Sequence, residues 1–170
     1  YPTTPIWHLE RPNFYVFGQD SWKPLLTREL EIYHLDEPPS STVVSKAYAI
    51  TQNKHSLHDS INAILNFVQG TINYLGYGTN TPKRPETVLR QGFGDCKSTS
   101  LLSVKLLESI GVRAWPTSVK ADGIDERLLD VYSGQAWDPL IVEFIFDGDT
   151  LPFDPTMFTQ RGYLSQKYMS

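Results

Sequence analysis

The sequence predicts a single α+β unit in which one central helix packs against an antiparallel sheet. Apolar residues recur at helical spacing between residues 56 and 110, which indicates substantial helices there. Beyond residue 111 the pattern changes to short apolar runs separated by a hairpin signal, as is typical of antiparallel strands. Helices that precede the strands, rather than alternating with them, favour the α+β class.

The composition narrows the possible functions. A chain of 170 residues can bury a core without disulfides or a bound metal. Its net charge is −4 and no stripe of Lys and Arg stands out, so we expect no nucleic-acid partner. No apolar run approaches the roughly 18 residues of a membrane span, and no signal peptide is recognisable. Because the chain opens with YPTTP instead of Met, we expect a processed product or part of a longer protein with other domains.

The first 40 residues are expected to form an arm ahead of a main domain over residues 41–170. Proline at this density argues against a helix, and the aromatic residues between the prolines argue against disorder. The prolines are Pro2, Pro5, Pro12 and Pro24. We therefore expect an extended arm that packs its rings on the domain, then a short helix at 25–36 and a loop at 37–41.

Three helices are predicted in the main domain, starting at Ser56, at about residue 85, and at Cys96. The first has a capping-box pattern, because Ser56 and Asp59 lie three residues apart ahead of an apolar helical stripe. A Gly- and Pro-rich loop over 73–86 joins it to the second. Gly111 is a natural stop for the third helix, because helices commonly end before a glycine.

Three strands are predicted after the helices, at 112–119, 140–147 and 150–154. The middle one, LIVEFIFD, is apolar enough to be buried on both faces. Asp147 and Gly148 form the hairpin signal that joins it to the last strand. The segment 121–135 is rich in polar residues and is expected to be a loop.

The only cysteine, Cys96, lies in the run GFGDCK at the predicted start of the third helix. The unpaired amides and the positive dipole end of a helix favour a thiolate there, and the same amides can donate to an oxyanion. Gly92 and Gly94 leave the approach to the sulfur open. Lys97 adds a nearby positive charge, which Asp95 partly opposes. A buried structural cysteine is an equally good interpretation of this spacing.

Acyl transfer by a thiol also needs a base, usually His, and a group that orients the base. The order of the elements suggests that both come from the hairpin at 137–154. Asp154, in the run LPFDPT, is the candidate orienting group. The alternative is an aspartate that only caps the following turn.

This region resembles the core of the transglutaminase-like superfamily, whose members are cysteine acyl-transfer enzymes with a papain-like fold. The central match is RPETVLRQGFGDCKSTSLLSVKLLESIGVRAWPTSV, which follows the family's pattern of a Cys-bearing helix, a glycine step and a strand. The resemblance extends upstream through INAILNFVQGTINYLGYG and downstream through LIVEFIFDGDTLPFDPT, so it covers residues 55–157. The GDCK run is most similar to a bacterial branch of the family. Together these motifs are specific, although each alone is weak.

The resemblance implies roles for several residues. Cys96 matches the nucleophile, and Asp154 matches the third member of a Cys-His-Asp triad. Tyr74 and Tyr77 fall where the family places groups that line the cleft or support the oxyanion, with aromatic packing as the alternative. Trp137 matches an aromatic residue ahead of the family's histidine, and it would flank the cleft or pack on the sheet.

The family's histidine is missing from this sequence. In the segment WDPLIV, Pro139 stands in the position of the histidine. Proline has neither a side-chain base nor an amide hydrogen, so it cannot move a proton. Asp138 would point to the opposite face of the strand. A shifted alignment offers no substitute, because the histidines of the chain are His8, His34, His55 and His58.

Three interpretations remain open. The first, prompted by Pro139, is a catalytically impaired domain that binds a peptide, an amide-type ligand or a partner protein. The second is an active peptidase, amidase or transamidase whose base comes from elsewhere, such as His8 or another domain. The third is a structural adaptor with an inert Cys96. We expect no cofactor and no metal, and the bacterial resemblance favours a periplasmic or secreted location.

Overall fold

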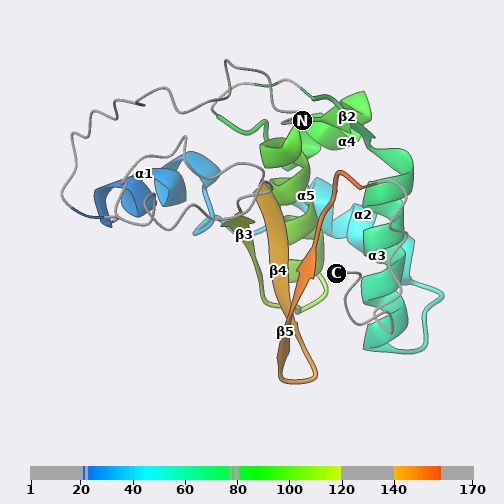
Figure 1. The fold of residues 1–170 in the computed structure, drawn as a ribbon. Helices are drawn as coiled ribbons and strands as arrows, with labels where there is room; N and C mark the ends of the chain where they lie inside the picture. The colour runs from blue at the N-terminus through cyan, green and yellow to red at the C-terminus, as the bar shows by residue number, and fades with distance from the viewer. Residues whose placement is uncertain (1–20, 22, 77, 79–80, 120–139, 158–170) are drawn as a thin grey trace, which may run out of the picture.

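The computed structural model describes residues 21, 23–76, 78, 81–119 and 140–157, and it confirms the α+β class (Figure 1). The helices are α1 (Lys23–Tyr33), α2 (Ser41–Thr51), α3 (Leu57–Thr71), α4 (Pro85–Gln91) and α5 (Cys96–Glu108). The strands are β1 (Asn73–Tyr74), β2 (Phe93–Gly94), β3 (Ala114–Ser118), β4 (Leu140–Phe146) and β5 (Asp149–Phe153). The predicted helix that starts at Cys96 and the predicted hairpin are both present.

Helix α5 lies at the centre of the fold, with the sheet on one side and α2, α3 and α4 packed around it (Figure 1). It is buried on every side from Ser98 to Leu107. The hydroxyl groups of Thr99 and Ser103 can be buried because both find an acceptor: Thr99 donates to the Asp95 carbonyl at 2.7 Å, and Ser103 donates to the Thr99 carbonyl at 2.7 Å. The predicted central helix is therefore confirmed.

The main sheet has the strand order β3-β4-β5 and is antiparallel throughout. In the middle of β4, Phe144 pairs with Ala114 of β3 and with Leu151 of β5. Ser100 of α5 donates to the Leu140 carbonyl at 3.2 Å, which ties the beginning of β4 to the central helix. The start of β4, and the end of β5 that pairs beside it, are therefore held in fixed positions next to α5.

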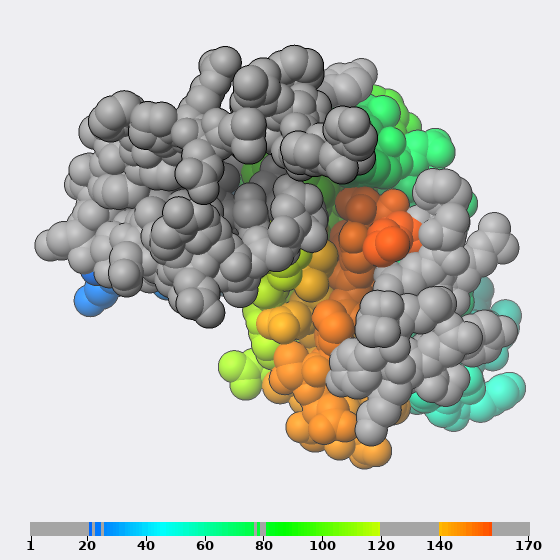
Figure 2. Space-filling view, viewed as in Figure 1, coloured from blue at the N-terminus to red at the C-terminus, as the bar shows by residue number. Residues whose placement is uncertain are grey.

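The prediction that β4 is buried on both faces is wrong. Alternate residues of β4, beginning with Leu140, are buried against α5, whereas the residues between them are partly exposed. The outer face carries Glu143, which accepts hydrogen bonds from Trp115 at 3.0 Å and Thr117 at 2.9 Å. The hairpin of β4 and β5 reaches the surface on this face (Figure 2). A run of apolar letters hid the two-sided character of the strand, because Ile141 and Ile145 occupy outward positions.

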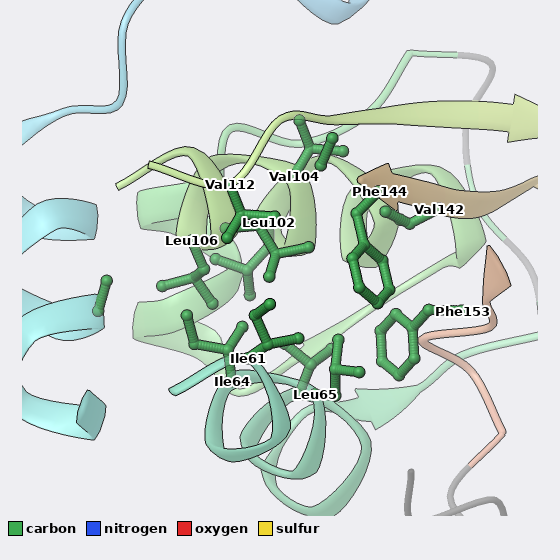
Figure 3. Close-up of a cluster of buried hydrophobic side chains, with 14 of the residues drawn as sticks. Ile61, Ile64, Leu65, Leu102, Val104, Leu106, Val112, Val142, Phe144 and Phe153 are labelled. Carbon is green, nitrogen blue, oxygen red and sulfur yellow. The ribbon is translucent and has the colours of Figure 1, made fainter. Parts of the chain in front are cut away.

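The hydrophobic core lies between the sheet, α5 and α3. Phe144 of β4 and Phe153 of β5 share one buried cluster with residues from both helices (Figure 3). The helical members labelled there are Ile61, Ile64 and Leu65 of α3 and Leu102, Val104 and Leu106 of α5. All of them are almost completely shielded from solvent. This cluster holds the sheet against the helix that begins at Cys96.

The predicted start of α3 is confirmed. Ser56 is the N-cap: its hydroxyl oxygen accepts from the Asp59 amide at 3.0 Å and donates to the Asp59 carboxylate at 2.8 Å. The hydrogen bond from Ser56 lowers the pKa of the Asp59 carboxyl, and His58 lowers it further. Gly111 has a φ of 79°, the left-handed conformation expected just beyond the end of α5.

Helix α2 has no counterpart among the predicted elements. Its sequence, STVVSKAYAIT, is rich in β-branched residues, which have weak helix propensity. Ser40 caps it, and only Val43 and Ala47 are buried, one helical turn apart. The helix therefore forms because its narrow apolar face packs on α3 and α5.

Several predictions lie outside the described residues. These are the arm over residues 1–20, the loop at 121–135, Tyr77, Trp137, Asp138 and Pro139. The predicted short helix at 25–36 is present as α1, which begins two residues earlier and ends three residues earlier. Among the residues that the structure describes, no helix combines the length and apolar character needed to cross a membrane.

Candidate active site

Cys96 is the first residue of α5, and the segment before it is fixed by backbone pairing. Helix α4 ends at Gly92, which has a φ of 74°, and β2 follows directly. Strand β2 runs parallel to β1: the Asn73 amide donates to the Gly92 carbonyl and the Leu75 amide to the Gly94 carbonyl, both at 2.9 Å. These bonds set the direction from which the chain enters α5, and so they position the thiol.

Asp95 is the N-cap of α5. Its carboxylate accepts from the Ser98 amide at 2.8 Å. The sequence suggested that Asp95 would partly oppose the charge of Lys97. In the structure Asp95 also caps the N-terminus of α5. The first amides of a helix have no acceptor within the helix, and for the Ser98 amide the Asp95 carboxylate supplies one.

The loop that follows β1 crosses the N-terminus of α5. The Lys83 amide donates to the Ser98 hydroxyl at 2.9 Å, which pins the end of the loop. Gly78 lies so close to the Asp95 carboxylate that a β-carbon on Gly78 would overlap it. A β-carbon on Gly94 would lie 3.2 Å from Ser98 and Thr99, so this glycine permits close packing on α5 rather than an open approach.

We expect Gly78→Ala to lower the unfolding free energy by about 1–2 kcal/mol, because either the loop must move or Asp95 must leave its cap. The matched control is Gly76→Ala, since a β-carbon on Gly76 meets no atom within 4 Å. That change should be neutral or slightly stabilising. Urea unfolding of both variants measures the difference, and equal effects would show that the loop does not rest on the cap.

Among the residues that the structure describes, Cys96 packs in an apolar cluster. The residue is 8% exposed and belongs to a buried cluster with Tyr33 of α1, Leu101 of α5 and Leu140 of β4. Ile32 and Leu35 pack against this cluster from the end of α1 and the turn beyond it. Sequence reasoning did not find Tyr33, because nothing in a short N-terminal helix signals contact with a residue 63 positions later.

Asp154 lies one residue beyond β5 in a turn that holds its carboxylate. Oδ1 of Asp154 accepts from the Thr156 amide at 2.8 Å and from the Thr156 hydroxyl at 2.7 Å. The Asp154 carbonyl accepts from the side-chain amide of Gln69 at 2.9 Å, and Gln69 is only 4% exposed on α3. Within the described part of the chain, no hydrogen-bond donor reaches Oδ2 of Asp154. The aspartate therefore caps its turn with Oδ1.

Cys96 and Asp154 both lie near one end of the main sheet, the end at which β4 begins. Phe153, the neighbour of Asp154, pairs with Val142 near the start of β4. Leu140, the first residue of β4, shares the buried cluster of Cys96. Tyr74, in contrast, lies on β1 with 46% of its surface exposed.

Two solved structures have the same fold. The "putative protease" of Parabacteroides distasonis aligns with a TM-score of 0.66 and 18% identity, over 79% of this chain and 26% of its own. The "putative cysteine protease" of Cytophaga hutchinsonii aligns with a TM-score of 0.57 and 16% identity, over 79% of this chain and 45% of its own. The chain thus spans less than half of either neighbour, and at this identity the likeness shows the fold alone.

No curated protein matches the chain. The family profile of the Transglutaminase-like superfamily matches residues 44–155, from α2 to the turn that contains Asp154. This range includes Cys96, α5 and the whole main sheet. It confirms the resemblance seen in the sequence, while the closer similarity to a GDCK branch stays a prediction. The chain belongs to the transglutaminase-like superfamily.

Proposed function

We propose that this domain is a catalytically impaired member of its superfamily, which retains a thiol and an orienting acid but lacks the base between them. In this proposal it binds a peptide, an amide-type ligand or a partner protein at the cleft around Cys96. The observation that carries the proposal is Pro139. It stands where the family has histidine and immediately precedes Leu140, the first residue of β4.

Loss of the histidine removes the group that would take the proton of the thiol and return it to a leaving amine. General acid–base catalysis typically contributes about 10²–10⁴-fold to a rate. Two of the described histidines have acidic partners: His34 contacts Glu37 at 3.1 Å, and His58 contacts Asp59 at 3.6 Å.

The features that remain are suited to binding. The positive dipole end of α5 favours a carbonyl oxygen near Cys96, and the apolar cluster beside Cys96 can accept a hydrophobic side chain. A peptide bond next to an apolar residue offers both groups. We place this activity in the domain over residues 41–170, with residues 1–40 as a preceding arm.

Restoring the histidine tests the proposal. In Pro139→His, Cys96 should hydrolyse p-nitrophenyl acetate about 10²-fold faster than in the unchanged protein. Pro139→Ala is the matched control, because it removes the proline without adding a base. Adding Cys96→Ala to Pro139→His should abolish the gain, which ties the activity to the thiol.

Two results would contradict the proposal. If the unchanged protein already hydrolyses the ester efficiently through Cys96, a base comes from elsewhere and the domain is an active acyl-transfer enzyme. If Pro139→His behaves like Pro139→Ala, the lost base is not the only defect of the cleft.

A peptide library displayed on beads, with retention compared between the protein and a Leu140→Asp variant, tests binding directly.

A further inference from the structure

Helix α1 touches the rest of the described structure through its last turn. Its described side chains from Lys23 to Glu31 are exposed, including Leu26 and Leu30. Ile32 is partly buried and Tyr33 is 2% exposed. In Figure 1 α1 lies apart from α2, α3 and α4. A helix held by one end is suited to movement as a unit.

The buried end of α1 lies against the thiol. Tyr33 is 2% exposed and shares one buried cluster with Cys96, Leu101 and Leu140. A ligand that reaches Cys96 has to displace part of this cluster, because the residue is only 8% exposed. The chain therefore places one of its own aromatic side chains where a ligand side chain would bind.

A buried lysine fastens the turn after Tyr33. Lys105 of α5 is 5% exposed, and its Nζ donates to the carbonyls of Leu35 at 3.1 Å and Glu37 at 2.7 Å. It also pairs with Glu108 at 2.9 Å. A buried ammonium is costly without such partners, so the turn and the lysine stabilise each other. The two hydrogen bonds from Lys105 to the carbonyls of Leu35 and Glu37, here called the Lys105 clamp, join this turn to α5, the helix that begins with Cys96.

Two other features belong to the same turn. Arg84 donates to the Glu37 carboxylate at 3.0 Å, and this hydrogen bond lowers the pKa of the Glu37 carboxyl. His34 has a φ of 48°, a left-handed conformation that is uncommon for a residue other than glycine. Such a conformation persists when surrounding contacts impose it. The turn is thus held in place by contacts on both sides.

We propose that residues 23–37 form a cover over Cys96, closed by Tyr33 and by the Lys105 clamp. When the cover opens, it exposes an apolar surface formed by Cys96, Leu101 and Leu140. This surface fits an aromatic side chain of a peptide, because it now holds the ring of Tyr33. The ligand class rests on the proposed function, whereas the cover itself does not depend on catalysis or on a ligand.

Alkylation of Cys96 by iodoacetamide measures opening of the cover. Lys105→Met keeps the length of the side chain and removes the clamp, so the labelling rate should rise roughly tenfold or more. Leu30→Ala is the matched control on the exposed face of α1 and should leave the rate unchanged. Rapid labelling of the unchanged protein, or no rise in Lys105→Met, would overturn the cover.

Labelling at several urea concentrations below the unfolding transition separates local opening from general destabilisation. Opening of the cover exposes little surface, so the rate in Lys105→Met should depend weakly on urea. A rate that rises as steeply as global unfolding would instead show that the variant labels through the unfolded state, and the cover would be rejected.

The side chain that the site accepts can be tested with p-cresol, which is the tyrosine side chain without its backbone. Tyr33→Ala should label faster than the unchanged protein, and millimolar p-cresol should slow it again at least about twofold. An equal concentration of glycerol should have no effect. Absence of protection by p-cresol would overturn the aromatic ligand class. None of these measurements uses turnover, so they are independent of the outcome for Pro139→His.

Discussion

Phe144→Ala is expected to lower the unfolding free energy by about 3–5 kcal/mol, the largest stability loss that we predict for this protein. Phe144 is 1% exposed and lies in the middle of β4, between Ala114 and Leu151. Its ring is part of the cluster that joins the sheet to α3 and α5 (Figure 3). Removal leaves a cavity that rigid neighbours on three elements cannot close. Domains of this size are stable by only about 5–15 kcal/mol, so the variant should unfold near physiological temperature.

The matched control for this prediction is Ile145→Ala. Ile145 is the next residue of the same strand, but it faces outward and is partly exposed. Its truncation should cost about 1 kcal/mol, since neighbouring atoms and solvent can fill the space. Urea unfolding followed by circular dichroism measures both variants. Equal losses would mean that the inner face of β4 is not the main contact between sheet and helices.

The sequence predicted the elements whose signals are local. Ser56 starts α3 through a cap that spans three residues, and Asp147 and Gly148 mark a hairpin that the next few residues complete. Cys96 at the start of α5 belongs to this group, because the helix pattern begins directly after it. In each case the residues that determine the structure are neighbours in the sequence.

The features that the sequence did not predict depend on contacts between distant residues. Tyr33 reaches the cluster of Cys96, Gln69 holds the carbonyl of Asp154, and Lys105 binds carbonyls of the turn after α1. A tyrosine, a glutamine or a lysine in a helix is usually exposed, so composition and spacing favour the wrong environment. Only the packing of α1 and α3 against α5 makes these residues important for the site.

The proposed orienting role of Asp154 gives the second large expected effect: in a Pro139→His background, Asp154→Asn should lower ester hydrolysis by roughly 10²-fold or more. An asparagine can still accept the hydrogen bonds of Thr156 through its carbonyl oxygen, so the turn should keep its shape. The change removes the negative charge of the carboxylate, which in the proposal orients the imidazole. The histidine would then lose both its orientation and the charge that stabilises its protonated form.

The same substitution in the unchanged protein is the decisive comparison. With Pro139 in place there is no imidazole to orient, so Asp154→Asn should leave the trace rate unaltered, and the two changes should be strongly non-additive. Thr156→Val serves as a control for the turn, because it removes the hydroxyl that donates to Oδ1 and keeps the carboxylate charge. Equal effects of Asp154→Asn in both backgrounds would mean that Asp154 only stabilises the turn and does not orient a base. A large effect confined to the Pro139→His background would mean that the domain has kept the position of its acid after losing the base that the acid orients.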